Sequence, residues 1–355
     1  MNDPPTRSAF VIGERIAWVD TAKGLGIALV VVGHVLRGLV ASNVISATPG
    51  AVFIDAWIYA FHMPLFFFLS GLFLSRSATK PFLEFARDKV RTIAYPYFVW
   101  SLIVLLIKTP LGPIVNQPRN LLQVPDILYH PAEQFWFLYV LFLISLALGI
   151  LLKLGIKPWA VVLFSVVLSS GIWPLPWSGW VPFELARSNA IYVALGIVVG
   201  KNELFRFLFV AEGRALAAAS VASFLVVTLF VGFLETNHSP LLGVVVAVSG
   251  MAGVVFLAVF INRRKLDSSI NFLGRYSLEI FVAHTIASSA IRILMQRVLH
   301  IAAPAPYFLF CTIVGLYGPI FIAIVFKHLG FRWAFTIPKR NVIKLKQDEG
   351  LGMLG

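Results

Sequence analysis

Residues 18–34 read WVDTAKGLGIALVVVGH, an apolar run that carries three ionisable side chains, Asp20, Lys23 and His34. Lys23 and His34 are eleven residues apart, close to three helical turns, so they share one helix face about 16 Å apart along the axis. Asp20 lies one turn before Lys23 on nearly the same stripe. Because ionisable groups in a membrane-spanning helix are costly, they normally face a protein interior or a wet cavity. The segment therefore predicts a first membrane span that carries a functional site.

The rest of the chain repeats this apolar character. It is 59% hydrophobic and 13% charged, with a mean hydropathy of +0.87, and a soluble domain cannot hide so much apolar surface. We expect an all-α polytopic protein of the plasma (inner) membrane with about ten transmembrane helices. The predicted spans are 17–40, 51–75, 92–109, 134–153, 157–173, 187–201, 214–234, 240–262, 273–298 and 305–327. They form a membrane domain, 17–328, between a cytoplasmic N-terminal segment, 1–16, and a basic cytoplasmic tail, 329–355.

Basic side chains divide unevenly between the two sets of linkers. Most of the 29 lysines and arginines fall in the N-terminal region, in the linkers that follow every second span, and in the tail. Those on the opposite side are Arg37, Lys108, Arg119, Arg187, Arg292 and Arg297. By the positive-inside rule, this asymmetry places both termini in the cytoplasm. Topology alone then explains the net charge of +13, and nucleic acid is not an expected partner.

His34 has the chemistry of a general base. A neutral imidazole near pH 7 can take a proton from a hydroxyl while that hydroxyl attacks a carbonyl. Lys23 is compact and cationic, suited to hold a phosphate or a carboxylate, and Asp20 is within its reach. Two plainer interpretations stay open. The histidine can serve only to fix helix packing, and the lysine can simply flank the membrane or pair with Asp20.

The second predicted span places another histidine at a similar depth. It reads IYAFHMPLFFFLSG over residues 58–71 and runs back from the outside, so His62 should lie near His34 on an adjacent helix. Pro64 can kink this helix by freeing the carbonyl of Ala60. Two imidazoles could form an acid–base pair or clamp a substrate; a structural hydrogen bond at the kink is the alternative. With no carboxylate or thiolate at ligand spacing, they predict no metal site.

Five basic residues follow the second span, between Arg76 and Arg91. The positive-inside rule and attraction to anionic lipid are sufficient to explain them. A functional interpretation is also available. Arg87 and Arg91 lie one turn apart on the helix that enters the third span, and they could grip the phosphates of a nucleotide-bearing cofactor.

Two further regions carry weaker candidates. Trp136 opens the fourth span shortly after Glu133, and an interfacial tryptophan usually belongs to the aromatic belt, although it can also stack on a sugar ring. The ninth span carries Glu279 and His284. Their spacing of five places them about 140° apart around a helix, so they should not face the same neighbour. Both are secondary candidates.

Four segments of the sequence occur in an order typical of one family. They are Asp20-x-x-Lys23-Gly24 followed by Gly33-His34, then MPLFFFLSG at 63–71, then FWFL at 135–138, and finally GRYS at 274–277 leading to Phe281 and His284. Together they resemble the acyltransferase-3 family of integral-membrane O-acyltransferases. The likeness covers nearly the whole chain.

The resemblance implies ten helices, cytoplasmic termini and transfer of an acyl group, usually acetyl, from cytoplasmic acyl-coenzyme A to a hydroxyl of a glycan. It also implies that His34 is the catalytic residue and Lys23 its partner, with Asp20 beside them. The arginines after the second helix are associated with the coenzyme, here Arg87, Lys89 and Arg91. We expect the acceptor to meet His62, Trp136 and Glu133. Direct transfer and an acyl-histidine intermediate both stay open.

A transporter or flippase for a glycan or a lipid-linked intermediate is the alternative of a different class. It would also need about ten spans, intramembrane histidines and broken helices. A catalytically silent scaffold is a third interpretation, but it leaves the stripe of Asp20, Lys23 and His34 unexplained. A transferase should be stabilised by acyl-coenzyme A and should release free thiol when acceptor is present, whereas a transporter should do neither.

Overall fold

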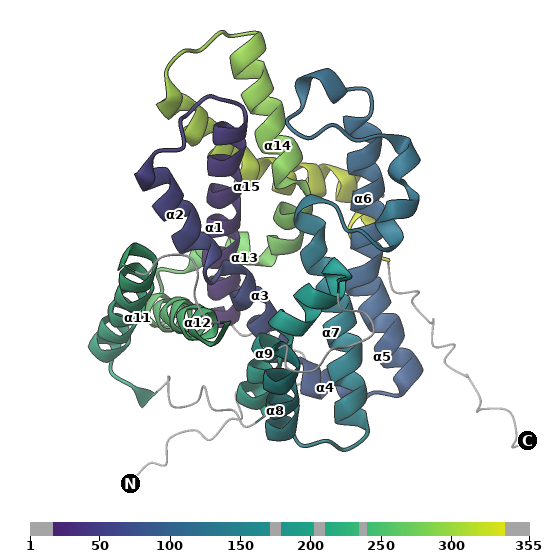
Figure 1. Cartoon of the computed structure of the whole chain (residues 1–355), viewed down its shortest axis with the longest axis vertical. Coiled ribbons are helices and arrows are strands. Elements are labelled where there is room, and N and C mark those ends of the chain that lie inside the picture. Colours follow the sequence, from purple (N-terminus) through teal and green to yellow (C-terminus); the bar gives the residue numbers. More distant parts are fainter. Residues whose placement is uncertain (1–16, 171–178, 202–209, 234–239, 338–355) are drawn as a thin grey trace, which may run out of the picture.

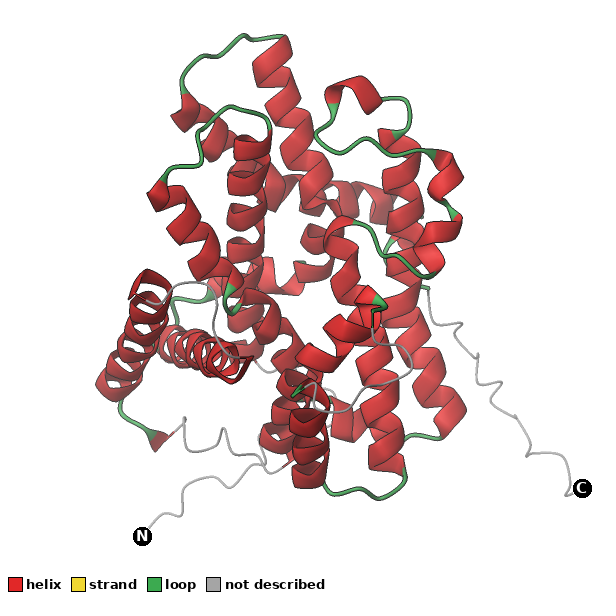
Figure 2. Ribbon diagram, in the orientation of Figure 1, coloured by secondary structure: helices red, strands yellow, loops and turns green. Residues whose placement is uncertain are grey.

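The computed structural model describes residues 17–170, 179–201, 210–233 and 240–337, and this part of the chain is helical, without strands (Figure 2). The predicted N-terminal segment, 1–16, and residues 338–355 of the predicted tail lie outside it. The helices are α1 (Ala17–Ala41), α2 (Pro49–Tyr59), α3 (His62–Gly71), α4 (Leu74–Ala78), α5 (Phe82–Lys89), α6 (Tyr95–Lys108), α7 (Trp136–Lys153), α8 (Pro158–Ser169), α9 (Val181–Lys201), α11 (Gly213–Phe233), α12 (Pro240–Arg263), α13 (Ser268–Arg275), α14 (Ser277–Arg297) and α15 (Pro304–His328). A π-helical stretch, Val90–Ala94, joins α5 to α6.

Nine helical segments within the described ranges are long and apolar enough to cross a membrane. They confirm an all-α polytopic membrane protein. The predicted span 157–173 is not among these nine. Its helix, α8, has only 12 residues, fewer than the roughly 20 that a perpendicular span needs. Residues 171–178, which follow it, are outside the described part.

Two of the predicted spans are interrupted. The span 51–75 is divided into α2 and α3 at Ala60 and Phe61, where Phe61 leaves the helical region with φ −141°. Pro64 lies in the first turn of α3 and has no N–H for the carbonyl of Ala60, so the sequence-based expectation of a kink here is confirmed. The span 273–298 begins instead at Ser277, after the short helix α13 and a break at Tyr276.

Helix α1 lies at the centre of the bundle, against α2, α3, α12, α13, α14 and α15 (Figure 1). Its first half is in backbone contact with α13. A Cβ atom on Gly24 would lie 2.1 Å from the carbonyl oxygen of Ile270, and one on Gly274 would lie 1.8 Å from that of Asp20. Thr21 also donates to Asn271 Oδ1 at 2.6 Å. The glycines near the start of α1 therefore serve close helix packing, and α13 occupies the space beside them.

The long connection between α6 and α7 folds over one end of the bundle in short 3-10 turns (Figure 1). The hydroxyl of Tyr97, on α6, donates to the carbonyl of Ile127, and the hydroxyl of Tyr139, on α7, donates to that of Leu128 at 2.8 Å. These bonds fix the connection to the two helices that it joins. The connection ends in a 3-10 turn, Glu133–Phe135, which places Glu133 directly before α7.

Candidate active site

A cavity of about 510 Å³ lies between α1, the break before α3, the start of α7, and helices α14 and α15. Its polar lining comes from residues distributed between positions 34 and 292 of the sequence. These residues are His34, Arg37, Tyr59, His62, Lys108, Asn116, Gln117, Glu133, Gln134, Thr285, Ser288, Ser289 and Arg292. Apolar side chains and Trp136 close the remaining wall. The cavity thus contains the predicted base, His34, and all three residues predicted to meet the acceptor.

Two other imidazole groups lie close to His34. The ring of His284 is 5.0 Å from that of His34, nearly perpendicular to it. The Tyr59 ring lies 6.0 Å from His34 and 4.5 Å from His62. His62 and His284 are fully buried, whereas His34 is partly exposed to the cavity. His34 is therefore the histidine that a substrate can reach.

Each of the three imidazoles is oriented by a backbone carbonyl four residues earlier, which for His62 belongs to α2. The Nδ1 atoms of His34 and His62 lie 3.0 Å and 2.8 Å from the carbonyl oxygens of Val30 and Ile58, four residues earlier. His284 Nδ1 lies 2.9 Å from the carbonyl of Ile280. A carbonyl only accepts hydrogen bonds, so in the neutral ring Nδ1 carries the hydrogen and Nε2 keeps a lone pair. His34 thus holds an Nε2 base ready beside the cavity.

The first turns of α2 and the last turns of α1 carry a fixed ion pair near this base. Arg37 donates to both carboxylate oxygens of Asp55, at 2.7 and 2.9 Å. The guanidinium carbon of Arg37 lies 3.2 Å from the centre of the Tyr59 ring. Gly33 allows this approach, since a Cβ there would already lie 3.1 Å from Tyr59. Tyr59 is thereby held between Arg37 and the histidines.

The wall opposite α1 carries a second ion pair. Lys108, at the end of α6, bonds to Glu133, and both side chains are largely buried. Gln134 donates to the hydroxyl of Thr285 at 3.0 Å, which links the start of α7 to α14. Trp136 stands next to them in the cavity lining. Glu133 is therefore committed to Lys108 and shapes the cavity together with Trp136.

Lys23 and Asp20 lie elsewhere. Neither lines the His34 cavity. Lys23 Nζ is 4.0 Å from a carboxylate oxygen of Asp20, and the Asp20 backbone packs on Gly274. The stripe seen in the sequence is thus divided between a packing contact at one end of α1 and the cavity at the other. A catalytic role for Lys23 and Asp20 stays a prediction.

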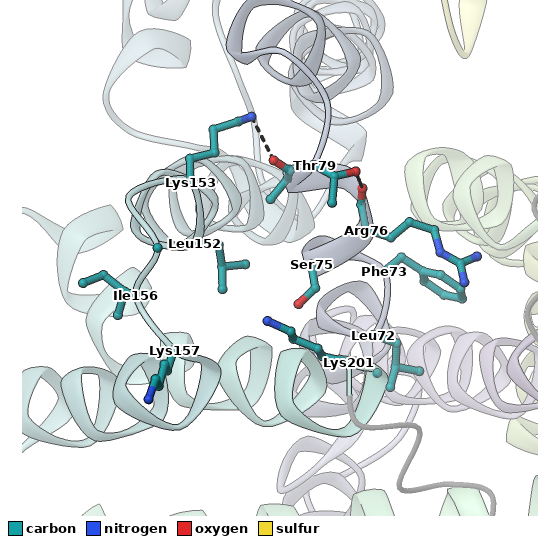
Figure 3. A pocket seen from close by; sticks show the side chains of 13 residues that line it. Leu72, Phe73, Ser75, Arg76, Thr79, Leu152, Lys153, Ile156, Lys157 and Lys201 are labelled. Carbon is teal, nitrogen blue, oxygen red and sulfur yellow. Dashed lines mark hydrogen bonds between the residues drawn. The ribbon is translucent and has the colours of Figure 1, made fainter.

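A second pocket, of about 750 Å³, lies between the end of α3, α4, and the ends of α7 and α9 (Figure 3). Four basic residues line it: Arg76, Lys153, Lys157 and Lys201. Lys201 and Ser75 point toward one another across it (Figure 3). Lys153 instead donates to the carbonyl oxygens of Ala78, at 2.8 Å, and of Lys80. No acidic residue of the described chain is part of this lining, so the charged side chains that line the pocket are all basic.

Arg87, Lys89 and Arg91 do not line this basic pocket. Arg87 and Lys89 form the last turn of α5, and Arg91 belongs to the π-helical stretch that follows. Lys89 lies 5.5 Å from the ring of Phe85. Nearby, Lys80 pairs with Glu84 at 3.2 Å and with Asp88, and these hydrogen bonds raise the pKa of Lys80. The three predicted coenzyme residues are thus separate from the pocket, and their role stays a prediction.

The sequence interpretation underrated three cavity residues. His284 ranked as a secondary candidate, Arg292 entered only as an outward charge, and Tyr59 was not considered. Arg292 carried a usable signal, because an arginine inside a predicted span needs an explanation. Glu279 does not line the cavity, as its angle from His284 predicts. Within the described residues, no three His, Cys, Asp or Glu side chains are placed to hold a metal ion.

The sequence of this chain is similar to sequences of known proteins. The family model described as "Acyltransferase domain" (the acyltransferase-3 model) matches residues 16–336. Nodulation protein NolL of Mesorhizobium japonicum is 28% identical over 135 residues, which cover 37% of this chain and 35% of that protein. The match therefore spans about a third of that relative. No solved structure matches the chain.

Proposed function

This chain belongs to the acyltransferase-3 family, and on that premise we propose that it moves an acyl group, acetyl foremost, from cytoplasmic acyl-coenzyme A to a hydroxyl of a cell-surface or exported glycan. That the protein is a membrane-embedded acyltransferase follows from its family and from the nine long apolar helices of the described residues. The donor, the acceptor class and the acyl group are parts of the proposal.

One observation carries the proposal: His34 lines a cavity large enough for a substrate and is held with Nε2 available. The cavity measures about 510 Å³, and ligand sites of this size are usual for small molecules. Its histidine is fixed by the Val30 carbonyl at 3.0 Å and by the rings of Tyr59 and His284. Such fixed orientation is what general-base catalysis needs.

In the proposed reaction, His34 Nε2 takes the proton of the acceptor hydroxyl while the hydroxyl oxygen attacks the thioester carbonyl. The new C–O bond forms, the C–S bond breaks, and the imidazolium returns its proton to the departing thiolate. Trp136 and the Lys108–Glu133 pair form the wall against which the acceptor would rest. The neutral tautomer with Nδ1 bonded to Val30 suits this cycle, because only Nε2 exchanges the proton.

The donor would enter from the opposite, basic end of the bundle. The phosphates of coenzyme A need cationic partners, and the fit there is reasonable, because Lys157, Lys201 and Arg76 line a pocket without acidic residues in the described chain. Arg87, Lys89 and Arg91 lie outside this pocket, at the end of α5 and in the π-helical stretch that follows, and their contact with the coenzyme is part of the proposal. This arrangement also agrees with cytoplasmic termini and an inner-membrane location, both of which belong to the proposal.

The test replaces His34 by alanine in the full chain and measures acyl transfer in membranes. We expect H34A to lower kcat by about 10²- to 10⁴-fold, the usual contribution of a general base, with normal protein abundance. His328 is an exposed histidine at the end of α15, so H328A is the matched control and should retain full activity. Wild-type activity of H34A would contradict the proposal.

A further inference from the structure

Arg292 is a buried cation in the wall of the His34 cavity. It lies on α14, eight residues after His284, so about 12 Å further along the helix axis and on a nearby face. Only 6% of its surface is exposed. Its guanidinium donates to Gln296, one turn further along α14, so Arg292 and the histidines occupy separate parts of the cavity lining. The space between them includes Ser288 and Ser289, which also line the cavity.

Arg292 differs from the other two cations of this cavity in its partners. Arg37 is paired with Asp55, and Lys108 with Glu133. Arg292 donates to the amide oxygen of Gln296 at 2.8 Å, and none of the ion pairs formed by the described residues includes it. The cavity lining therefore contains one positive charge that is not balanced by a carboxylate.

An unbalanced buried cation is costly, and ionisable side chains within membrane spans commonly mark substrate pathways. A guanidinium offers five N–H donors in a planar fork, and a single neutral amide oxygen uses one of them. The remaining donors match the two oxygens of a carboxylate or of a phosphate, which arginine binds in a bidentate manner. The chemistry of the site thus favours an anion.

We infer that Arg292 binds an anionic group of the acceptor, a carboxylate or a phosphate carried by the sugar unit that is acylated or by its neighbour. The inference rests on the proposed function, since it places the acceptor in the His34 cavity. Binding of the anion at Arg292 orients the acceptor so that a hydroxyl faces His34 Nε2. Arg292 is accordingly a specificity residue that selects acidic glycans over neutral ones.

The first experiment identifies the ester. Surface and exported glycans are isolated from the source organism and from a strain lacking this protein, and NMR determines which ester disappears. We expect the lost ester on or next to a sugar with a carboxylate or a phosphate, and the spectrum distinguishes these two. An ester lost from a glycan without any anionic group would overturn the role of Arg292 and leave the transferase intact. If no ester changes, the proposed function itself fails.

The second experiment restores the missing protein as the R292Q, R292K or R297Q variant. Arg297 is exposed on the same helix and lies outside the cavity, so R297Q is a control with the same loss of charge. We expect R292Q to reduce the ester at least about tenfold, because a charge-assisted bidentate contact is lost. R292K keeps the positive charge but lacks the planar guanidinium, so it should restore part of the ester. R297Q should restore all of the ester.

Abundance and thermal unfolding of each variant are measured in the same membranes. A folded R292Q variant that restores the full ester would overturn the inference. If R292Q does not accumulate, the R292K variant and the identity of the esterified sugar still test whether Arg292 binds an anion. An arginine with a purely structural role would not require an anionic acceptor. In that case, an ester on a neutral glycan would again contradict the proposal.

Discussion

The His34 cavity lies at the start of α7 and the basic pocket at its end, and the cations of the two sites have different partners. In the cavity, Arg37 and Lys108 each have a carboxylate partner. In the pocket, Lys153 bonds to backbone carbonyls, and the described lining contains no carboxylate. The cavity thus balances two of its three cations and leaves Arg292 without a carboxylate, whereas the described lining of the pocket balances none of its cations with a carboxylate. This contrast fits a donor and an acceptor that arrive from different sides.

Removing the carboxylate of an ion pair in the cavity should give the largest effect, a loss of stability. The side chains of Lys108 and Glu133 are only 18% and 11% exposed, so E133Q leaves a buried ammonium without its counter-charge. We expect roughly 3 kcal/mol of lost stability, as for other broken buried pairs, measured by thermal unfolding in detergent. The double variant K108M/E133Q removes both charges and should recover most of it.

The exposed pair of Lys80 and Glu84 supplies the control for this measurement. Glu84 is 56% exposed, and surface pairs contribute little. E84Q should therefore change the melting temperature far less than E133Q does. Two results would show that burial of the Lys108–Glu133 pair does not determine its effect on stability. One is an equal change of melting temperature in E84Q and E133Q, and the other is a double variant as unstable as E133Q.

A smaller effect is expected from the histidine that neighbours the base. His284 lies 5.0 Å from His34, edge to face, and H284F keeps a ring of similar shape while removing the nitrogens. We expect a tenfold or somewhat larger loss of kcat, since small errors in the placement of a catalytic group are costly. The KM for acyl-coenzyme A should not change, because the site proposed for the donor's phosphates does not include His284. A full kcat in H284F would limit His284 to packing.

The sequence predicted the all-α membrane architecture, since hydropathy depends on local composition; the orientation of the termini, inferred from the charges, stays a prediction. It also predicted that His34 and His62 lie at one depth, and both line the same cavity. It could not show that His284, 250 residues later, meets His34, because that depends on how α14 packs on α1. The stripe of Asp20, Lys23 and His34 was divided for a similar reason: Gly24 and Gly274 let two backbones touch, a contact that periodicity does not reveal.

The smallest effect is expected at the basic pocket, where Lys157 and Lys201 are exposed. K157Q/K201Q should raise the KM for acyl-coenzyme A about fivefold without changing kcat, since each basic group contributes on the order of 1 kcal/mol at most. The difference in KM should shrink as salt is raised from about 50 to about 500 mM, because the screening length then shortens roughly threefold. K265Q/K327Q removes two basic residues outside the pocket and should leave KM unchanged. If both double variants raise KM equally, attraction depends on the net charge of the surface and the pocket has no specific part in donor binding.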